Sequence, residues 1–407
     1  MHHPISRCSG RRPRNIDFHK QQLFGGLKMI SFVTRSMIFL LLLTYFSDNS
    51  IIVHADYNAP SAEMNISVRT SPSATYEHRM VLRNKAALRL YQDGKEEQTE
   101  HRPVLSDIYV TITKNNGTKN FRMDQSGSLW NEAESTHLIL TPKATKQLLV
   151  HANFLRKHHY GTLVPWSDAK ALLPRKSTFS IIDLEKGLRF RVQRRAGSRH
   201  ADVQPLTKAD TKTMKQVYDD RWSWDRRSIV VVTDDNKKIA ASMNGMPHGG
   251  DGIPDNGFSG HFCVHFLGSS THKSIHPDLM HQVMVYTASG KLSDLLHRLS
   301  PELLSEVFIG ALSQRDSNLL AAVTEGAHSE TVNYFLKQME NGTTYRMMKR
   351  KEFPDTDNGH RLTTVLELPV FVKQKNMSEK GVAIRFEFAR ESVLSPWKIR
   401  NVSPRNK

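Results

Sequence analysis

Ser259-Gly260-His261-Phe262-Cys263-Val264-His265 is an apolar run in which histidines alternate with a single cysteine. Successive side chains of a β-strand point to opposite faces, so an extended run places His261, Cys263 and His265 on the same face. The run follows a Gly-rich segment and precedes a segment with helical spacing. We therefore expect it to be a strand of a β-sheet domain that holds a thiol between two imidazoles.

Cys263 has no evident partner for a disulfide, because the chain has only one other cysteine, Cys8, which lies ahead of an apparent export signal. A thiol among histidines is a nucleophile, a metal ligand or a small buried residue. A nucleophilic thiol needs a base beside it. His248, in Met246-Pro247-His248-Gly249-Gly250, is carried by a flexible Gly-rich segment that can bring it opposite the thiol. With such a base, the thiol pKa is expected below the free value of about 8.5.

The pair His248-Gly249, followed after a loop by His261-x-Cys263, resembles the signature of the L,D-transpeptidase catalytic domain. That family has a His-Gly pair, a loop of similar length and then Ser-His-Gly-Cys. The resemblance covers roughly residues 177–290. It implies acyl transfer on peptidoglycan stem peptides, with Cys263 as the nucleophile, His248 as the general base and His261 as the residue that orients it and shapes the oxyanion site.

The chain departs from that family's pattern beside the cysteine. Phe262 stands where the family has glycine and is expected to crowd the oxyanion loop, while Gly260 stands where serine is usual. His265 replaces an arginine, which weakens the binding of a substrate carboxylate near neutral pH. We expect Gly249 and Gly260 to let backbone amides approach a reacting carbonyl, and His265 and Arg195 to contact the substrate.

A metal site is the alternative, because His200-Ala201-Asp202 is a His-x-Asp pair and several histidines crowd the segment 261–281. Three protein ligands and a water molecule suffice for a hydrolytic zinc centre. In that case, His200, Asp202 and His261 bind zinc in a cell-wall peptidase, whereas the cysteine mechanism needs no cofactor. A third hypothesis is a wall-binding protein whose site has lost catalysis.

The charge of the chain favours an anionic partner, since its 407 residues carry a net charge of +17. The basic residues are spread along the chain without a finger or helix-turn-helix motif, so nucleic acid is not expected. Peptidoglycan or another anionic polymer of the cell envelope fits better. Arg35 and the apolar run 37–46 have the pattern of a secretory signal, or of a membrane anchor over 29–47. Since two cysteines are few for a disulfide-stapled eukaryotic domain, we expect a bacterial extracytoplasmic protein, secreted or anchored at the cell wall.

The fold expected from these patterns is multidomain and mainly β, with α+β parts. A cone-like C-terminal domain resembles nuclear-transport-factor-like accessory domains. The segments, in order, are a leader with a signal or anchor (1–55), a polar linker (56–80), an accessory β-module with a helix (81–165), an L,D-transpeptidase-like catalytic β-domain (177–290) and an α+β accessory domain (298–407).

Local patterns predict the main elements of these segments. Alternation and turn residues predict strands at 88–92, 108–113, 179–184, 188–193, 228–232, 239–243, 363–372 and 382–388. Apolar spacing and end signals predict helices at 143–159, 207–218, 278–288, 300–324 and 330–339. Thr207 and Asp210 form a capping box at the start of the second helix.

Overall fold

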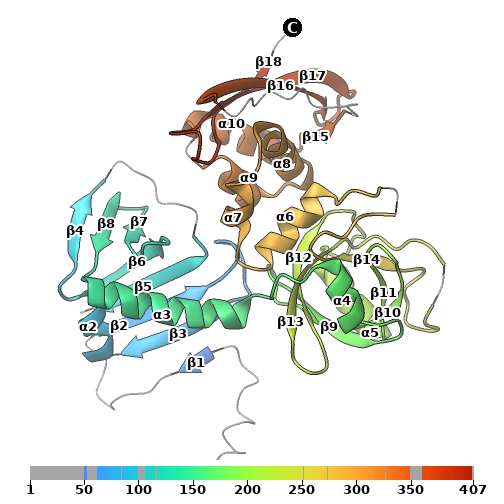
Figure 1. Cartoon of the computed structure of the whole chain (residues 1–407), viewed down its shortest axis with the longest axis horizontal. Coiled ribbons are helices and arrows are strands. Elements are labelled where there is room, and N and C mark those ends of the chain that lie inside the picture. Colours follow the sequence, from blue (N-terminus) through green and yellow to red (C-terminus); the bar gives the residue numbers. More distant parts are fainter. Residues whose placement is uncertain are drawn as a thin grey trace, which may run out of the picture. The chain divides into compact units, whose positions relative to one another are not determined.

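Three β-sheets organise the described part of the chain (Figure 1). The computed structural model describes residues 50–52, 62–83, 85–99, 106–114, 117–250, 252–272, 274–325, 327–348 and 360–405. Residues 50–407 belong to one unit of the chain. The prediction of a mainly β fold with additional helices is confirmed at this level.

The predicted signal or anchor at 29–47 lies outside the described residues, as does most of the predicted leader. Among the residues that are described, no helix is both long enough and apolar enough to cross a bilayer. Residues 50–52, which we expected in the leader, form a short strand that pairs with a strand at 78–83.

The first sheet has eight strands, and a long helix packs along it. In sheet order the strands are β1 (Ser50–Ile52), β3 (His78–Arg83), β2 (Ala62–Val68), β5 (Ile108–Lys114), β6 (Gly117–Met123), β7 (Leu129–Asn131), β8 (Thr136–Ile139) and β4 (Lys95–Gln98). Helix α3 (Pro142–His159) lies against β2 and β3 (Figure 1). Its buried residues Leu148, Ala152 and Leu155 recur at helical spacing and form one apolar stripe.

Two predictions for this region are wrong. The segment 56–80 is not a linker throughout, because β2 lies between β3 and β5 and buries Met64, Ile66 and Val68. The segment 88–92, expected as a strand, falls largely in helix α2 (Lys85–Tyr91). Contacts with the sheet, which no local pattern reveals, stabilise both elements.

The second sheet is a closed barrel formed by the segment that resembles the L,D-transpeptidase domain. Around the barrel its strands are β10 (Arg189–Ala196), β11 (Ala201–Pro205), β14 (Phe262–His265), β13 (Lys238–Met243), β12 (Arg227–Val232) and β9 (Thr178–Asp183). The predicted hairpins β9–β10 and β12–β13 are confirmed. Helices α4 (Trp166–Leu172) and α5 (Lys208–Val217) lie beside the barrel, and α5 begins with the predicted capping box.

Phe262 belongs to the core of this barrel. Its side chain is fully buried, with ring centroids 6.4 Å from Phe190 and 5.8 Å from Phe258. Val264 is buried in the same core. Because side chains alternate along β14, Cys263 points away from this core. The ring of Phe262 therefore packs on the opposite side of β14 from the thiol.

The C-terminal part is an α+β arrangement in which helices pack on one face of a curved four-stranded sheet (Figure 1). Phe308, Phe335 and Phe386 meet in its core. The elements are α6 (Leu279–Thr287), α7 (Leu292–Leu296), α8 (Pro301–Gln314), α9 (Ser317–Val323), α10 (Ser329–Glu340), β15 (Thr344–Met347), β16 (Thr363–Lys373), β17 (Lys380–Ala389) and β18 (Lys398–Arg405). The helix predicted over 300–324 is two helices, because Arg315 is left-handed and Asp316 caps α9.

Candidate functional site

The pairing of β11 with β14 brings a carboxylate to the thiol. The antiparallel register sets Asp202 directly opposite Cys263 and Val203 opposite Phe262. Residues paired across antiparallel strands project from the same face of the sheet. Asp202 and Cys263 therefore share the face that points away from the barrel core.

His248 reaches the thiol from the other side of β14. Its backbone pairs with His261 through two hydrogen bonds, with N···O distances of 2.9 and 2.7 Å. Its Nε2 lies 3.3 Å from Cys263 Sγ, and its Nδ1 lies 2.9 Å from the carbonyl oxygen of Met246. Because a carbonyl only accepts, Nδ1 carries the hydrogen, and the Nε2 lone pair faces the thiol. The predicted cysteine–histidine contact is thus present.

Two glycines make this close approach feasible. Gly260 has φ +85°, and a Cβ there would lie 2.3 Å from the carbonyl oxygen of His248. Gly249 has φ +74°, and a Cβ there would lie 2.2 Å from the ring of His261. Both positions require glycine because of packing between the two histidine segments.

Gly260→Ala is expected to move His248 away from the thiol and to lower the rate of Cys263 acylation by at least about tenfold, because misplaced catalytic groups lose rate steeply. The rate is measured by intact-protein mass spectrometry with a thiol-acylating substrate. Gly268→Ala is the matched control: it has φ +71° but nothing within 4 Å of its Cβ position. If both variants lose the same factor in acylation rate, the cause is backbone strain at a left-handed position and not the displacement of His248.

His261, the predicted orienting residue, lies beside His248 but does not orient its ring. The two ring centroids are 4.5 Å apart, and His261 Nε2, 3.7 Å from Asp202 Oδ1, has no hydrogen-bond partner. Burial lowers the pKa of His261, more than Asp202 raises it, so the ring is neutral near neutral pH. The Met246 carbonyl orients the base instead. Sequence patterns do not single out a backbone carbonyl.

A third histidine reaches the thiol from the loop after β14. His272 Nε2 lies 3.7 Å from Cys263 Sγ and 3.1 Å from His200 Nε2. His200 Nδ1 in turn lies 2.7 Å from the carbonyl oxygen of Ser270. No spacing in the sequence distinguishes His272 from the other histidines of the segment, and only the path of the loop places it here.

The side chains form two groups that are able to hold a metal ion. In each group the donor atoms lie within 4.8 Å of one another: His200, Asp202, Cys263 and His272 in the first, and His248, His261 and His272 in the second. The zinc alternative named His200, Asp202 and His261. The first two do lie together, and His261 Nε2 lies 3.7 Å from Asp202 Oδ1 but belongs to the second group.

The thiol itself is enclosed by the surrounding residues. Cys263 is 4% exposed. Burial and the nearby Asp202 carboxylate raise the pKa of the Cys263 thiol. The prediction of a pKa below the free value is therefore wrong, because burial of the sulfur and the nearby carboxylate both disfavour the thiolate.

Alkylation of metal-free Cys263 by iodoacetamide near neutral pH is expected to be at least about tenfold slower than in the unfolded chain, since each unit of raised pKa removes tenfold of thiolate. The rate should keep rising above the pH at which a free thiol is fully ionised. Asp202→Asn should accelerate it, because the repelling charge is removed. Mass spectrometry in chelator follows the reaction. A rate that levels off below neutral pH would contradict the raised pKa.

His265 and Arg195, which we expect to contact the substrate, are both engaged by neighbouring residues of the protein. His265 is buried, lies 3.1 Å from Ser269 Oγ through Nδ1, and stacks on His281 at 3.7 Å between centroids. No substrate reaches such a ring. Arg195 donates to Gln193 and, over 3.3 Å, to the carbonyl of Gly252. It therefore ties β10 to the Gly-rich segment.

Trp224 is an exposed aromatic surface next to the base. Its side chain is 55% exposed, and its ring centroid lies 5.1 Å from that of His248. The neighbouring Trp222 packs edge-on against Phe258 at 5.3 Å. Trp222 therefore packs against the barrel core, whereas Trp224 faces solvent.

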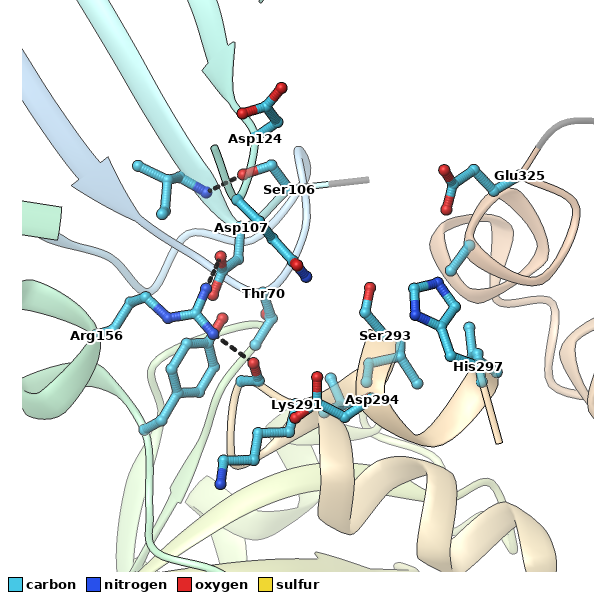
Figure 2. Close-up of a pocket in the computed structure, with 18 of the residues that line it drawn as sticks. Thr70, Ser106, Asp107, Asp124, Arg156, Lys291, Ser293, Asp294, His297 and Glu325 are labelled. Atoms are coloured by element: carbon cyan, nitrogen blue, oxygen red, sulfur yellow. Dashed lines mark hydrogen bonds and ion pairs between the residues drawn. The ribbon is translucent and has the colours of Figure 1, made fainter. Parts of the chain in front are cut away.

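A cavity of about 510 Å³ lies elsewhere, between the first sheet and the helices around α7 (Figure 2). Arg156 crosses one wall and donates to Asp107 and to the carbonyl of Gly290. His297 and Ser293 line the opposite wall, and no hydrogen bond joins them in the described part of the chain. The cavity offers a binding surface without a nucleophile paired to a base.

The chain matches no protein-family model, and no curated protein matches its sequence. The assignment of a function therefore depends on the geometry around Cys263.

Proposed function

We propose that this protein is an extracytoplasmic bacterial enzyme that transfers or hydrolyses acyl groups of peptidoglycan stem peptides through a thioester on Cys263. The observation that carries this proposal is the 3.3 Å contact between Cys263 Sγ and His248 Nε2, with Met246 holding the other ring nitrogen. A nucleophile, a base and a group that orients the base make a working triad. The resemblance of 177–290 to the L,D-transpeptidase domain supports the substrate class.

His248 acts as a true general base in this mechanism, because the thiol is protonated before it reacts. Sγ attacks the carbonyl carbon of a peptide bond while Nε2 takes the thiol proton. The imidazolium then gives this proton to the departing amine as the C–N bond breaks, leaving the acyl thioester. An incoming amine or water attacks the thioester, loses its proton to His248, and Cys263 leaves as the thiolate that recovers the proton. The products are a new peptide bond or a free carboxylate.

Access to the sulfur requires a small movement of one side chain. His272 lies against Sγ, and its side chain is 48% exposed. Rotation of this imidazole toward solvent uncovers the thiol beside Trp224, whose exposed ring is suited to contact an apolar part of the substrate. The charge of +17 favours the approach of an anionic wall polymer.

The proposal is tested by incubating the metal-free protein with a synthetic stem tetrapeptide and, separately, with a carbapenem that acylates thiols. A covalent adduct mapped to Cys263 is expected with the carbapenem, and turnover with the peptide. Absence of any adduct, while a thiol reagent detects the free cysteine after unfolding, would refute acyl transfer.

The location outside the cytoplasm is tested by fractionation of cells that produce the whole chain. We expect the protein in the envelope or medium, because 37–46 has the pattern of a secretory signal. Deletion of 29–47 should retain it in the cytoplasm. A cytoplasmic location of the intact chain would contradict the proposal of a wall substrate.

A further inference from the structure

We infer that His200, Asp202, Cys263 and His272 form a tetrahedral site for one divalent metal ion of the zinc class, and that this ion silences the Cys263 nucleophile. The silencing rests on the proposed function, whereas the metal site stands on its own geometry. The ion and the acyl donor compete for the same sulfur atom.

The distances between donor atoms match a zinc tetrahedron. Bonds of about 2.0–2.3 Å to nitrogen, oxygen and sulfur correspond to tetrahedral edges of about 3.3–3.7 Å. Four edges of the group are 3.1 Å (His200 Nε2 to His272 Nε2), 3.1 Å (His200 Nε2 to Asp202 Oδ1), 3.4 Å (His272 Nε2 to Asp202 Oδ1) and 3.7 Å (His272 Nε2 to Cys263 Sγ). The two remaining edges, from Cys263 to His200 and to Asp202, are at most 4.8 Å, so an ion fits after small shifts of these side chains.

Two donors are already prepared for a cation. His200 Nδ1 faces the carbonyl of Ser270 at 2.7 Å, so it carries the ring hydrogen and the Nε2 lone pair points to the centre of the group. Asp202 is 5% exposed, and its Oδ1 lies 3.1 Å from His200 Nε2 and 3.4 Å from His272 Nε2 without a hydrogen bond of good geometry. A buried carboxylate oxygen that is held only by such contacts is costly. A metal ion would satisfy it.

Charge selects this group over its neighbour. The Asp202 carboxylate and the Cys263 thiolate together balance a divalent ion, so the buried site becomes neutral. The group of His248, His261 and His272 offers only neutral imidazoles. We therefore place the ion in the first group, where His248 is not a ligand.

The loop that carries His272 is held in position from the start of β11. Arg199 Nη1 lies 3.4 Å from the carbonyl oxygens of both His272 and Ser274. The amide of Ser270 donates to the carbonyl of Arg199 over 3.2 Å. Being half-exposed, His272 is the ligand that opens and closes the site to solvent.

Metal binding blocks attack by the sulfur. The Cys263 thiol loses its proton to water as the metal–sulfur bond forms, and the lone pair needed for attack is then shared with the ion. Four protein ligands complete the tetrahedron and leave no position for a catalytic water, as in structural zinc sites. The metal-free protein is the acylating form, and the metal-bound protein is the silent form.

The site is tested by adding Co²⁺ and Zn²⁺ to the whole, chelator-treated protein. We expect one equivalent of Co²⁺, with a thiolate-to-cobalt charge-transfer absorption and the intense visible bands of tetrahedral cobalt. His272→Ala should weaken binding by at least about 100-fold, since an entire ligand is lost. His276→Ala, which removes an exposed histidine of the same loop, is the matched control and should bind normally. Equal binding by both variants would overturn the site.

The silencing is tested by a double comparison. His272→Ala should still form the acyl-enzyme but no longer be inhibited by Zn²⁺, whereas His248→Ala should bind the ion normally and fail to acylate. If the parent protein binds the ion but neither it nor a variant forms the acyl-enzyme after chelation, the proposed function is refuted and the metal site is retained. If the parent protein forms the acyl-enzyme but binds no metal ion, the metal site is refuted and the proposed function is retained. Acyl transfer or hydrolysis that increases with Zn²⁺ would overturn the silencing in favour of a zinc hydrolase.

Discussion

Cys263→Ala is expected to abolish acyl-enzyme formation and to lower peptide turnover by at least about 10³-fold, the scale seen when a member of a catalytic triad is removed. The loss follows because the thioester cannot form without the sulfur, and the only other cysteine, Cys8, lies in the predicted leader. Intact-mass analysis measures the adduct, and chromatography of the peptide products measures turnover.

The matched control is Cys8→Ser, which should behave as the parent protein. Cys263→Ala also removes one ligand of the proposed metal site, so the experiment is performed in chelator, where the metal has no influence. Cys263→Ala is also assayed without chelator. Hydrolysis that survives the substitution there, and that chelator then abolishes, would contradict the cysteine mechanism and favour a metal-dependent one.

Phe262→Gly is expected to lower the free energy of unfolding of the barrel by at least about 3 kcal/mol, as for other large-to-small changes in a core. The change restores the residue that the L,D-transpeptidase signature has before its cysteine. Here, however, it removes a fully buried ring that packs between Phe190 and Phe258. Thermal and denaturant unfolding measure the loss.

A phenylalanine at the surface serves as the control for this substitution. Phe154→Ala, at a side chain that is 41% exposed, should change the free energy of unfolding by less than about 1 kcal/mol. An unchanged stability of Phe262→Gly together with faster acylation would contradict the structure, because it would mean that the ring obstructs the thiol.

Elements with strong local patterns were predictable from the sequence. The alternation of 259–265, the hairpin over 179–193 and the capped helix at 207–218 depend on side-chain period and end signals that neighbouring residues supply. Weaker local patterns were misleading. Local composition predicts a linker where β2 lies, and one helix over 300–324 where there are two, because contacts with distant segments and a left-handed Arg315 decide these cases.

The sequence by itself determined that Cys263 lies on a strand with histidines on its face and that His248 is able to approach it. Only the tertiary structure decided what the thiol meets. Asp202 lies opposite Cys263 because of the register of β11 on β14, and His272 arrives because its loop is tied to Arg199. Register and loop path depend on packing between segments far apart in the chain, which leaves no trace in local spacing. For the same reason, only the structure showed that burial raises the thiol pKa.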